Sequence, residues 1–231
     1  MSSPVAVFLK QELSGWKRWE VIYVASATLA IAVISIVLGD SVLGIASAVT
    51  GTLYTMFAGK GKVSCYLFGI FNTVSYGWIA FSCTIYGDAM LNWGIYLPMM
   101  FVGLYLWKRR LDQDYCVIKT GLSPVWRLVI VVLNLGGIFL YALLLKNLGD
   151  RQPFIDSATT VLSVTAMTLT LFRCIEQWVL WSMVNLLSVI MWFRVFITTG
   201  GESVATLLWW LIMLVSGIIF FFQWRRSLHC R

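Results

Sequence analysis

The sequence predicts an all-α integral membrane protein with eight transmembrane helices. Hydrophobic residues make up 60% of the 231 residues, charged residues make up 12%, and the mean hydropathy is +0.85. A soluble domain carries about twice that charged fraction, whereas a membrane-spanning helix needs roughly 20 mostly apolar residues. Eight apolar segments approach this length, at residues 20–38, 41–58, 63–84, 89–107, 125–145, 157–172, 178–197 and 203–224.

The first segment lies near the N-terminus, where a signal peptide would also lie. It follows Lys17 and Arg18, and no small-x-small cleavage site precedes Asp40. Its apolar run is longer than the core of a signal peptide, so we expect a retained helix. The sequence leaves open a seven-span alternative, in which residues 20–38 lie on the membrane instead of crossing it.

The basic residues predict the orientation of the chain in the membrane. The net charge is +7, and in the eight-span arrangement most Lys and Arg residues fall on one face, including residues 17–18, 108–110 and 225–226. The opposite loops hold Lys146 and Arg151. By the positive-inside rule both termini are cytoplasmic. The basic charge therefore indicates membrane topology and not nucleic-acid binding.

The chain after residue 40 contains an internal repeat. An offset of 113 positions brings three apolar segments of residues 41–110 into step with three of residues 157–226. Each unit has an odd number of spans, so a second copy that followed the first directly would be inverted in the membrane. The additional segment at 125–145 gives the second copy the same orientation as the first. The result is a 3+1+3 parallel duplication. Its predicted parts are an N-terminal tail with an extra helix (1–40), a first three-helix unit (41–110), a linker with an inverting helix (111–156) and a second three-helix unit with a basic tail (157–231).

Two rows of polar and aromatic side chains recur in this repeat. Residues spaced i, i+3, i+7 and i+10 share one face of an α-helix. A repeated polar row at membrane depth predicts a substrate site between the two units, near the middle of the membrane. A structural alternative places Trp178 in the interfacial aromatic belt and uses the two Asn side chains to bond helices together. The second row is Trp178, Trp181, Asn185 and Ser188, and the offset of 113 gives the first row, Cys65, Phe68, Asn72 and Ser75.

Other residues of both units are candidates for the same site or for its entrance. Arg173 and Glu176 are spaced i, i+3 and are expected to pair at the cytoplasmic end, either as a gate or as a packing salt bridge. Single Ser and Thr hydroxyls in membrane helices more often bond their own backbone than a ligand. The further substrate-binding candidates are Tyr76, Asn92, Tyr96, Thr159 and Ser163.

The two rows restrict the chemistry of the ligand. Neither row contains Lys or Arg, so its rings and amides suit a planar, uncharged or cationic molecule and not a phosphorylated one. The sequence has no Ser-His-Asp set, metal cluster or phosphate loop, and its one histidine, His229, lies in the tail. We therefore predict no catalysis, no metal and no cofactor. No acidic residue lies in the middle of a predicted helix, which favours passive facilitation over ion-driven pumping.

A family resemblance spans residues 41–226 and rests chiefly on residues 156–185. The PnuC family of bacterial vitamin transporters, which carry nicotinamide riboside, has the pattern D-x-x-x-T followed by R-x-x-E-x-W-x-x-W-x-x-x-N. The chain resembles this pattern at Asp156, Thr160, Arg173, Glu176, Trp178, Trp181 and Asn185.

The resemblance implies a fold related to the SWEET class of duplicated three-helix transporters. It also implies facilitated diffusion (uniport) of nicotinamide riboside across the bacterial inner membrane, with a cytoplasmic kinase that phosphorylates the riboside and traps it for NAD synthesis. Trp178, Trp181 and Asn185 would then bind the substrate together with Phe68 and Asn72. Another vitamin or nucleoside such as thiamine, and a non-transporting membrane scaffold or sensor, are the open alternatives. The oligomeric state is also open, a homotrimer included.

Overall fold

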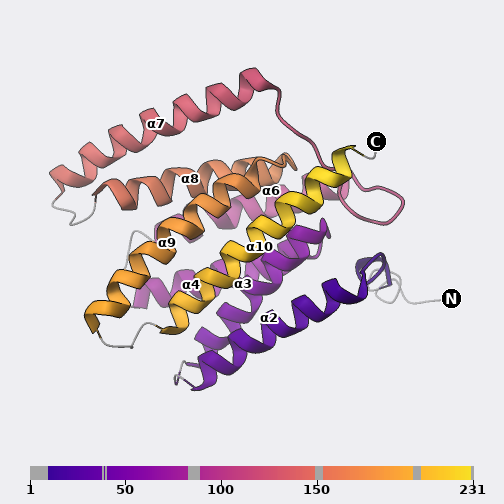
Figure 1. Cartoon of the computed structure of the whole chain (residues 1–231), viewed down its shortest axis with the longest axis horizontal. Coiled ribbons are helices and arrows are strands. Elements are labelled where there is room, and N and C mark those ends of the chain that lie inside the picture. The colour runs from indigo at the N-terminus through magenta and orange to yellow at the C-terminus, as the bar shows by residue number, and fades with distance from the viewer. Residues whose placement is uncertain are drawn as a thin grey trace. The chain divides into compact units, whose positions relative to one another are not determined.

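The computed structural model describes residues 10–37, 39, 41–82, 89–148, 153–199 and 204–229. Apart from two isolated β-bridges, the regular secondary structure of these residues is helical (Figure 1). In chain order the helices are α2 (Arg18–Val37), α3 (Val42–Lys60), α4 (Cys65–Ser82), the π-helix η1 (Leu91–Tyr96), α6 (Leu97–Lys108), α7 (Pro124–Asn147), α8 (Pro153–Leu171), α9 (Gln177–Thr199) and α10 (Val204–His229).

Each predicted apolar segment corresponds to a helix or, in one case, to two. The fourth segment is divided between η1 and α6, and α8 begins at Pro153, ahead of its predicted start at residue 157. The predicted ends at residues 38, 83–84 and 203 lie outside the described residues.

Five described helical segments are long and apolar enough to cross a membrane. They are Arg18–Val37, Val42–Lys60, Pro124–Asn147, Pro153–Leu171 and Leu207–Leu228. The chain is therefore a multi-pass membrane protein, and the total of eight spans stays a prediction.

The chain forms two compact units, Met1–Ile118 and Lys119–Arg231. In the first unit α2 packs on α3, α3 packs on α4, and α4 packs on η1 and α6. In the second unit α7 packs on α8, α8 on α9, and α9 on α10. The extra N-terminal helix thus belongs to the first unit, and the linking helix α7 belongs to the second.

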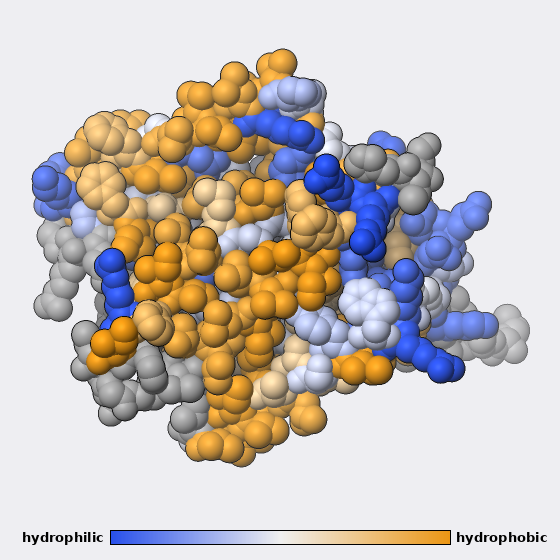
Figure 2. Space-filling model, viewed as in Figure 1, coloured by the Kyte–Doolittle hydropathy of each residue, from blue (hydrophilic) through white to orange (hydrophobic). Residues whose placement is uncertain are grey.

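Helix α7 shows how the chain meets the membrane. Among its 24 residues only Asn134 and Ala142 are buried, and Figure 2 shows hydrophobic residues (orange) over much of the visible surface. Asn134 joins α7 to α8, because its Oδ1 accepts a 3.0 Å hydrogen bond from Thr165 Oγ1 while its Nδ2 donates to the Ile130 carbonyl at 2.8 Å. A helix that is otherwise apolar and exposed is stable against lipid chains, where its backbone groups are satisfied internally.

The core of the first unit depends on a close approach between α4 and α6. The buried ring of Tyr66 packs edge-on against Trp107, with ring centroids 5.1 Å apart and planes at 90°. The same side chain covers Gly103, where a Cβ atom would lie 2.2 to 2.5 Å from Tyr66 Cε1, Cζ and the phenol oxygen. Small residues at such crossings let membrane helices approach closely and pack well.

Replacing Gly103 with Ala should therefore lower the stability of the protein by about 1–3 kcal/mol, because the new methyl group overpacks the Tyr66 ring. Thermal unfolding in detergent measures this effect. Gly136→Ala on α7 is the matched control, since no atom outside its helix neighbours lies within 4 Å of the added Cβ, and it should leave the melting temperature unchanged. Equal melting temperatures for both variants would contradict the prediction.

The regular α-helix is interrupted between residues 91 and 97. Pro98 has no backbone N–H, so the carbonyl one turn earlier, at Gly94, cannot receive an α-helical hydrogen bond from it. The chain adopts the π-helix η1 there, and the Leu97 N–H donates to the Asn92 carbonyl five residues earlier. π-helical turns of this kind occur frequently at functional sites, and this one contains the candidate residues Asn92 and Tyr96.

Candidate functional site

Each unit has one turn that leads into the helix carrying its candidate row. Gly61 in the α3–α4 turn has φ of +83°, and Arg173 in the α8–α9 turn has φ of +62°. The N–H of each donates to the carbonyl three residues earlier, and the following N–H donates to the carbonyl five residues earlier. Both turns are therefore Schellman motifs. Residue numbers 173 and 61 differ by 112, so this is the offset between the two turns.

The same offset of 112 applies to α4 and α9. Helix α4 begins four residues after Gly61, α9 begins four residues after Arg173, and both helices are uninterrupted. This offset pairs Tyr66 with Trp178. Each of these rings packs edge-on against a fully buried tryptophan of the last helix in its unit, Tyr66 against Trp107 at 5.1 Å and Trp178 against Trp224 at 5.7 Å. The predicted offset of 113 is wrong by one residue here. One residue turns an α-helix by about 100°, so the two predicted rows do not occupy equivalent faces.

Trp178 of the second row lies inside its own unit. Only 3% of the residue is exposed, and its ring packs against Phe220 at 5.1 Å as well as Trp224. Within the described residues its indole N–H has no hydrogen-bond partner. Both neighbouring rings belong to α10, so Trp178 holds α9 against α10.

Trp181 and Asn185 are the more available members of the second row. Trp181 is half-buried, and its Nε1 donates a long 3.4 Å bond to Thr170 Oγ1 on α8. Asn185 is 7% exposed and lies beside Gly217 of α10. Its amide makes no side-chain hydrogen bond to another described residue, and its nitrogen and oxygen are not among the fully buried side-chain atoms that lack a partner. Ser188, one turn further on, is also buried.

The first row makes contacts within its own unit. Cys65 is fully buried, and the half-buried ring of Phe68 lies 5.2 Å from that of Phe57. Asn72 Nδ2 donates to the Ser47 carbonyl at 2.8 Å on α3, and Ser75 Oγ donates to the Phe71 carbonyl of its own helix at 2.8 Å. Asn72 therefore bonds two helices of one unit.

The other predicted site residues have varied surroundings. Tyr76 is 43% exposed, whereas Asn92 and Ser163 are buried and Tyr96 is half-buried. Thr159 Oγ1 donates to the Ile155 carbonyl of its own helix at 3.1 Å. In the first unit the predicted residues lie on α4 and η1, and in the second unit they lie on α8 and α9.

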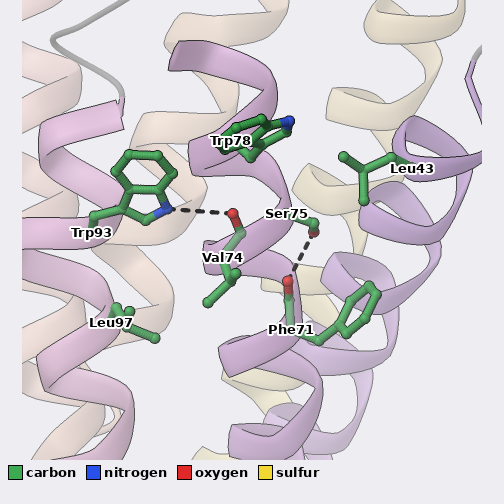
Figure 3. Close-up of a pocket in the computed structure, with 7 residues that line it drawn as sticks. All are labelled: Leu43, Phe71, Val74, Ser75, Trp78, Trp93 and Leu97. Carbon is green, nitrogen blue, oxygen red and sulfur yellow. Dashed lines mark hydrogen bonds between the residues drawn. The ribbon is translucent and has the colours of Figure 1, made fainter. Parts of the chain in front are cut away.

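A hollow of about 480 Å³ opens on the first unit between α3, α4, η1 and α6. Figure 3 shows Trp93 of η1 facing α4, where its Nε1 donates to the Val74 carbonyl at 3.3 Å. Since this indole N–H and the Ser75 hydroxyl are already bonded to backbone, the hollow offers few groups to a polar solute. Sequence reasoning did not single it out, although Trp78 and Trp93 within apolar helices were a signal. Its lining is Leu43, Phe71, Val74, Ser75, Trp78, Trp93 and Leu97.

The predicted pairing of Arg173 with Glu176 is wrong. The two residues do not share a helix, because residues 172–176 form the turn between α8 and α9. Glu176 Oε1 instead accepts a 2.9 Å bond from Arg127 Nε and a 3.1 Å bond from the Leu122 N–H. Arg127, in the first turn of α7, was not a sequence candidate. The carboxylate thus joins the start of α9 to the start of α7.

Glu176→Leu should destabilise the protein by about 1–3 kcal/mol, because the Leu122 N–H loses its acceptor. Arg127→Met should cost less than about 1 kcal/mol, because the Arg127 side chain is 56% exposed and such pairs are weak. Chemical or thermal unfolding of the two variants in detergent gives the comparison. A larger loss for Arg127→Met than for Glu176→Leu would show that the ion pair, and not the backbone contact, is the main link.

Across residues 10–37, 41–82, 89–148, 153–199 and 204–229, no group of three or more His, Cys, Asp or Glu side chains is placed to bind a metal ion.

The family described as "Nicotinamide mononucleotide transporter" matches residues 41–226, most of the chain. A relative named nicotinamide riboside transporter PnuC, from Neisseria mucosa, is 31% identical over 224 residues, which cover 94% of this chain and 85% of the relative. This chain belongs to the PnuC family. A second relative named nicotinamide riboside transporter PnuC, from Haemophilus influenzae, is 29% identical, with 96% of each chain covered.

A solved structure supports the same relationship. The crystal structure titled as the vitamin B3 transporter PnuC superposes with a TM-score of 0.82 at 31% sequence identity, covering 97% of both chains. The family resemblance inferred from residues 156–185 is therefore confirmed, and so is the all-α fold. The chain is a member of a membrane transport family and not of an enzyme family.

Proposed function

We propose that this chain transports nicotinamide riboside by facilitated diffusion. The observation that carries the proposal is Asn185, a residue 7% exposed whose amide makes no side-chain hydrogen bond among the described residues, on the same helix as the half-buried Trp181 in a PnuC-family chain. Buried polar groups are usually paired. An amide without a protein partner is suited to a ligand that can both donate and accept hydrogen bonds, such as a carboxamide or a sugar hydroxyl.

The chemistry of the candidate residues favours the riboside over the mononucleotide named in the family description. The two differ by a phosphate, which proteins bind with Arg, Lys or helix N-termini. None of the proposed substrate-binding residues is basic. The riboside carries a positive charge on its pyridinium ring, and an aromatic face attracts such a cation by about 0.5–2 kcal/mol.

We assign roles to the candidate residues accordingly. Trp181 stacks on the pyridinium, Asn185 bonds its polar groups, and Phe68 and Asn72 supply contacts from the first unit. Trp178 supports these residues by holding α9 against α10. The remaining proposed contacts are Ser188, Tyr76, Asn92, Tyr96, Thr159 and Ser163.

The placement of the acidic residues supports uniport. In the named helices α2 to α10, acidic side chains occur only in the first turns of α2 and α8, at Glu20 and Asp156. Proton and ion coupling in membrane transporters commonly uses carboxylates deeper in the membrane. A cytoplasmic kinase that phosphorylates the riboside for NAD synthesis would then drive net uptake.

The proposed topology is eight spans in a 3+1+3 duplication, in a bacterial inner membrane with both termini cytoplasmic. The matching Schellman motifs at Gly61 and Arg173 support the duplication, and the positive-inside rule supports the orientation. Reporter fusions at the two termini test the orientation directly, since a periplasm-dependent reporter should be inactive at both.

Purified protein in liposomes tests transport. Radiolabelled nicotinamide riboside should equilibrate into the vesicles without an ion gradient, and ionophores should not change the rate. Excess unlabelled riboside should compete, whereas nicotinamide mononucleotide and thiamine should compete weakly. Equilibration no faster than in empty vesicles rejects the function, and stronger competition by thiamine reassigns the substrate. Response to a partner protein but to no solute would favour a scaffold or sensor.

A further inference from the structure

The N-terminal residues 11–16, which we name the N-terminal clasp, lie outside the family match at residues 41–226 but are bonded to its first helices. Glu12 is 6% exposed, and its Oε2 accepts bonds from the Ser64 N–H at 3.2 Å and Ser64 Oγ at 2.6 Å. Ser64 directly precedes α4. A carboxylate at this position caps the helix and suits its dipole.

Lys62 fixes the clasp from the α3–α4 turn. Its side chain is fully buried, and its Nζ donates to the carbonyls of Gln11 at 3.0 Å and Asp114 at 2.8 Å, with a longer 3.4 Å contact to Ser14 Oγ. Burial of an ammonium group is costly unless oxygen atoms surround it. These oxygen atoms come from the clasp and from the segment after α6, so Lys62 ties both to the turn that begins α4.

A line of aromatic rings connects the clasp with the first row. The ring centroids of Trp16 and Phe57 are 5.2 Å apart, and those of Phe57 and Phe68 are also 5.2 Å apart. Trp16 is itself held by a 2.9 Å bond from its Nε1 to the Glu12 carbonyl and by Lys60 Nζ, 5.7 Å from its ring centroid. Displacing Trp16 would therefore leave Phe57 free to shift away from Phe68.

The second unit holds its equivalent turn in another way. With the offset of 112, Cys174 stands where the first unit has Lys62, and Glu176 stands where it has Ser64. The carboxylate is thus part of the turn itself and bonds to the Leu122 N–H and Arg127. The clasp is therefore an addition to the first unit and not a requirement of the turn.

We propose that the N-terminal clasp positions the first row, with Glu12 and Lys62 fixing the start of α4 and Trp16 setting the Phe68 ring through Phe57. These are positioning residues, which act on the substrate through Phe68. The part that concerns substrate affinity rests on the proposed function.

Amide hydrogen exchange on the full chain in detergent, without ligand, tests the mechanical part. Glu12→Gln and Lys62→Met should each speed exchange in the first turn of α4 by about tenfold or more, because charged hydrogen bonds that fix this turn are lost. Leu13→Ala is the matched control, because Leu13 lies in the same segment and is 67% exposed. Unchanged exchange in both variants overturns the clasp, whatever the protein binds.

A double-mutant cycle on binding tests the coupling to Phe68. Trp16→Leu should raise the Kd for nicotinamide riboside several-fold, and Trp16→Phe should restore most of the affinity. In a protein that already carries Phe68→Leu, Trp16→Leu should not raise the Kd further. A merely structural role would lower affinity equally in both backgrounds, so additive effects overturn the coupling. Absence of riboside binding by the unmodified protein would instead reject the proposed function, while the exchange experiment still decides on the clasp.

Discussion

Asn185→Leu should lower the affinity for nicotinamide riboside by about 10- to 100-fold while leaving the protein as stable as before or more stable. Asn185 is 7% exposed, and its amide makes no side-chain hydrogen bond among the described residues. Its replacement by an apolar side chain of similar size removes a desolvation cost and breaks no side-chain hydrogen bond to another described residue. The loss of a ligand hydrogen bond accounts for a decrease in affinity of this size. Calorimetric binding and thermal unfolding of the same sample measure the two effects.

Asn134→Leu is the matched control for this experiment. Asn134 is also buried, at 6% exposure, and lies on α7 of the same unit, but its amide bonds Thr165 and the Ile130 carbonyl. This variant should lose stability, by about 1–2 kcal/mol, and keep its affinity. If Asn185→Leu loses stability and keeps its affinity, Asn185 is a structural amide and the site assignment fails.

Trp178→Ala should destabilise the protein by about 3 kcal/mol, the largest stability effect that we expect from a single substitution in the second row. The ring is 3% exposed and packs on Phe220 and Trp224. In a membrane protein the loss comes mainly from packing between α9 and α10, since lipid is as apolar as the core. A decrease in the melting temperature in detergent measures it.

Trp126→Ala provides the comparison for Trp178, because Trp126 lies on α7 with 60% of the residue exposed. It should change the melting temperature little. Trp178→Phe should recover most of the stability, because a smaller ring still contacts α10. A stable Trp178→Ala protein with greatly weakened binding would place Trp178 in direct contact with the substrate, contrary to the packing described above.

The sequence predicted the helices well because a membrane helix has a simple requirement, a run of apolar residues long enough to bury its own backbone in lipid. Pro98 likewise marked the place where regular α-helix is interrupted, since a missing N–H has a local effect. The motif from Asp156 to Asn185 was sufficient to indicate the family.

The register between the two units could not be predicted in the same way. Apolar helices contain few distinctive residues, so the sequence alone did not distinguish an offset of 113, which aligns Asn72 with Asn185, from the offset of 112 between the two turns. The difference became visible only in the two Schellman motifs at Gly61 and Arg173. As a result Asn72 bonds α3, whereas Asn185 lies against α10.

The partners of the charged residues could not be predicted from the sequence either. Glu176 was expected to pair with a residue three positions away, but a turn separates the two, and its partner Arg127 is 49 positions distant. Lys62 and Glu12 similarly find their partners about 50 residues away. A charge in a membrane protein is placed by the need for oxygen or nitrogen partners wherever the fold supplies them.

The sequence by itself determined that this chain is a multi-pass helical membrane protein of the PnuC family, because hydropathy and a local motif depend on residues close together in the chain. Only the tertiary structure decided which face each helix buries, and hence that Trp178 packs on α10, that Asn185 lies beside Gly217 of α10, and that Glu12 bonds Ser64 at the start of α4. The physical reason is that a shift of one residue turns a helix by about 100°, and only packing and hydrogen bonding between distant segments determine that rotation.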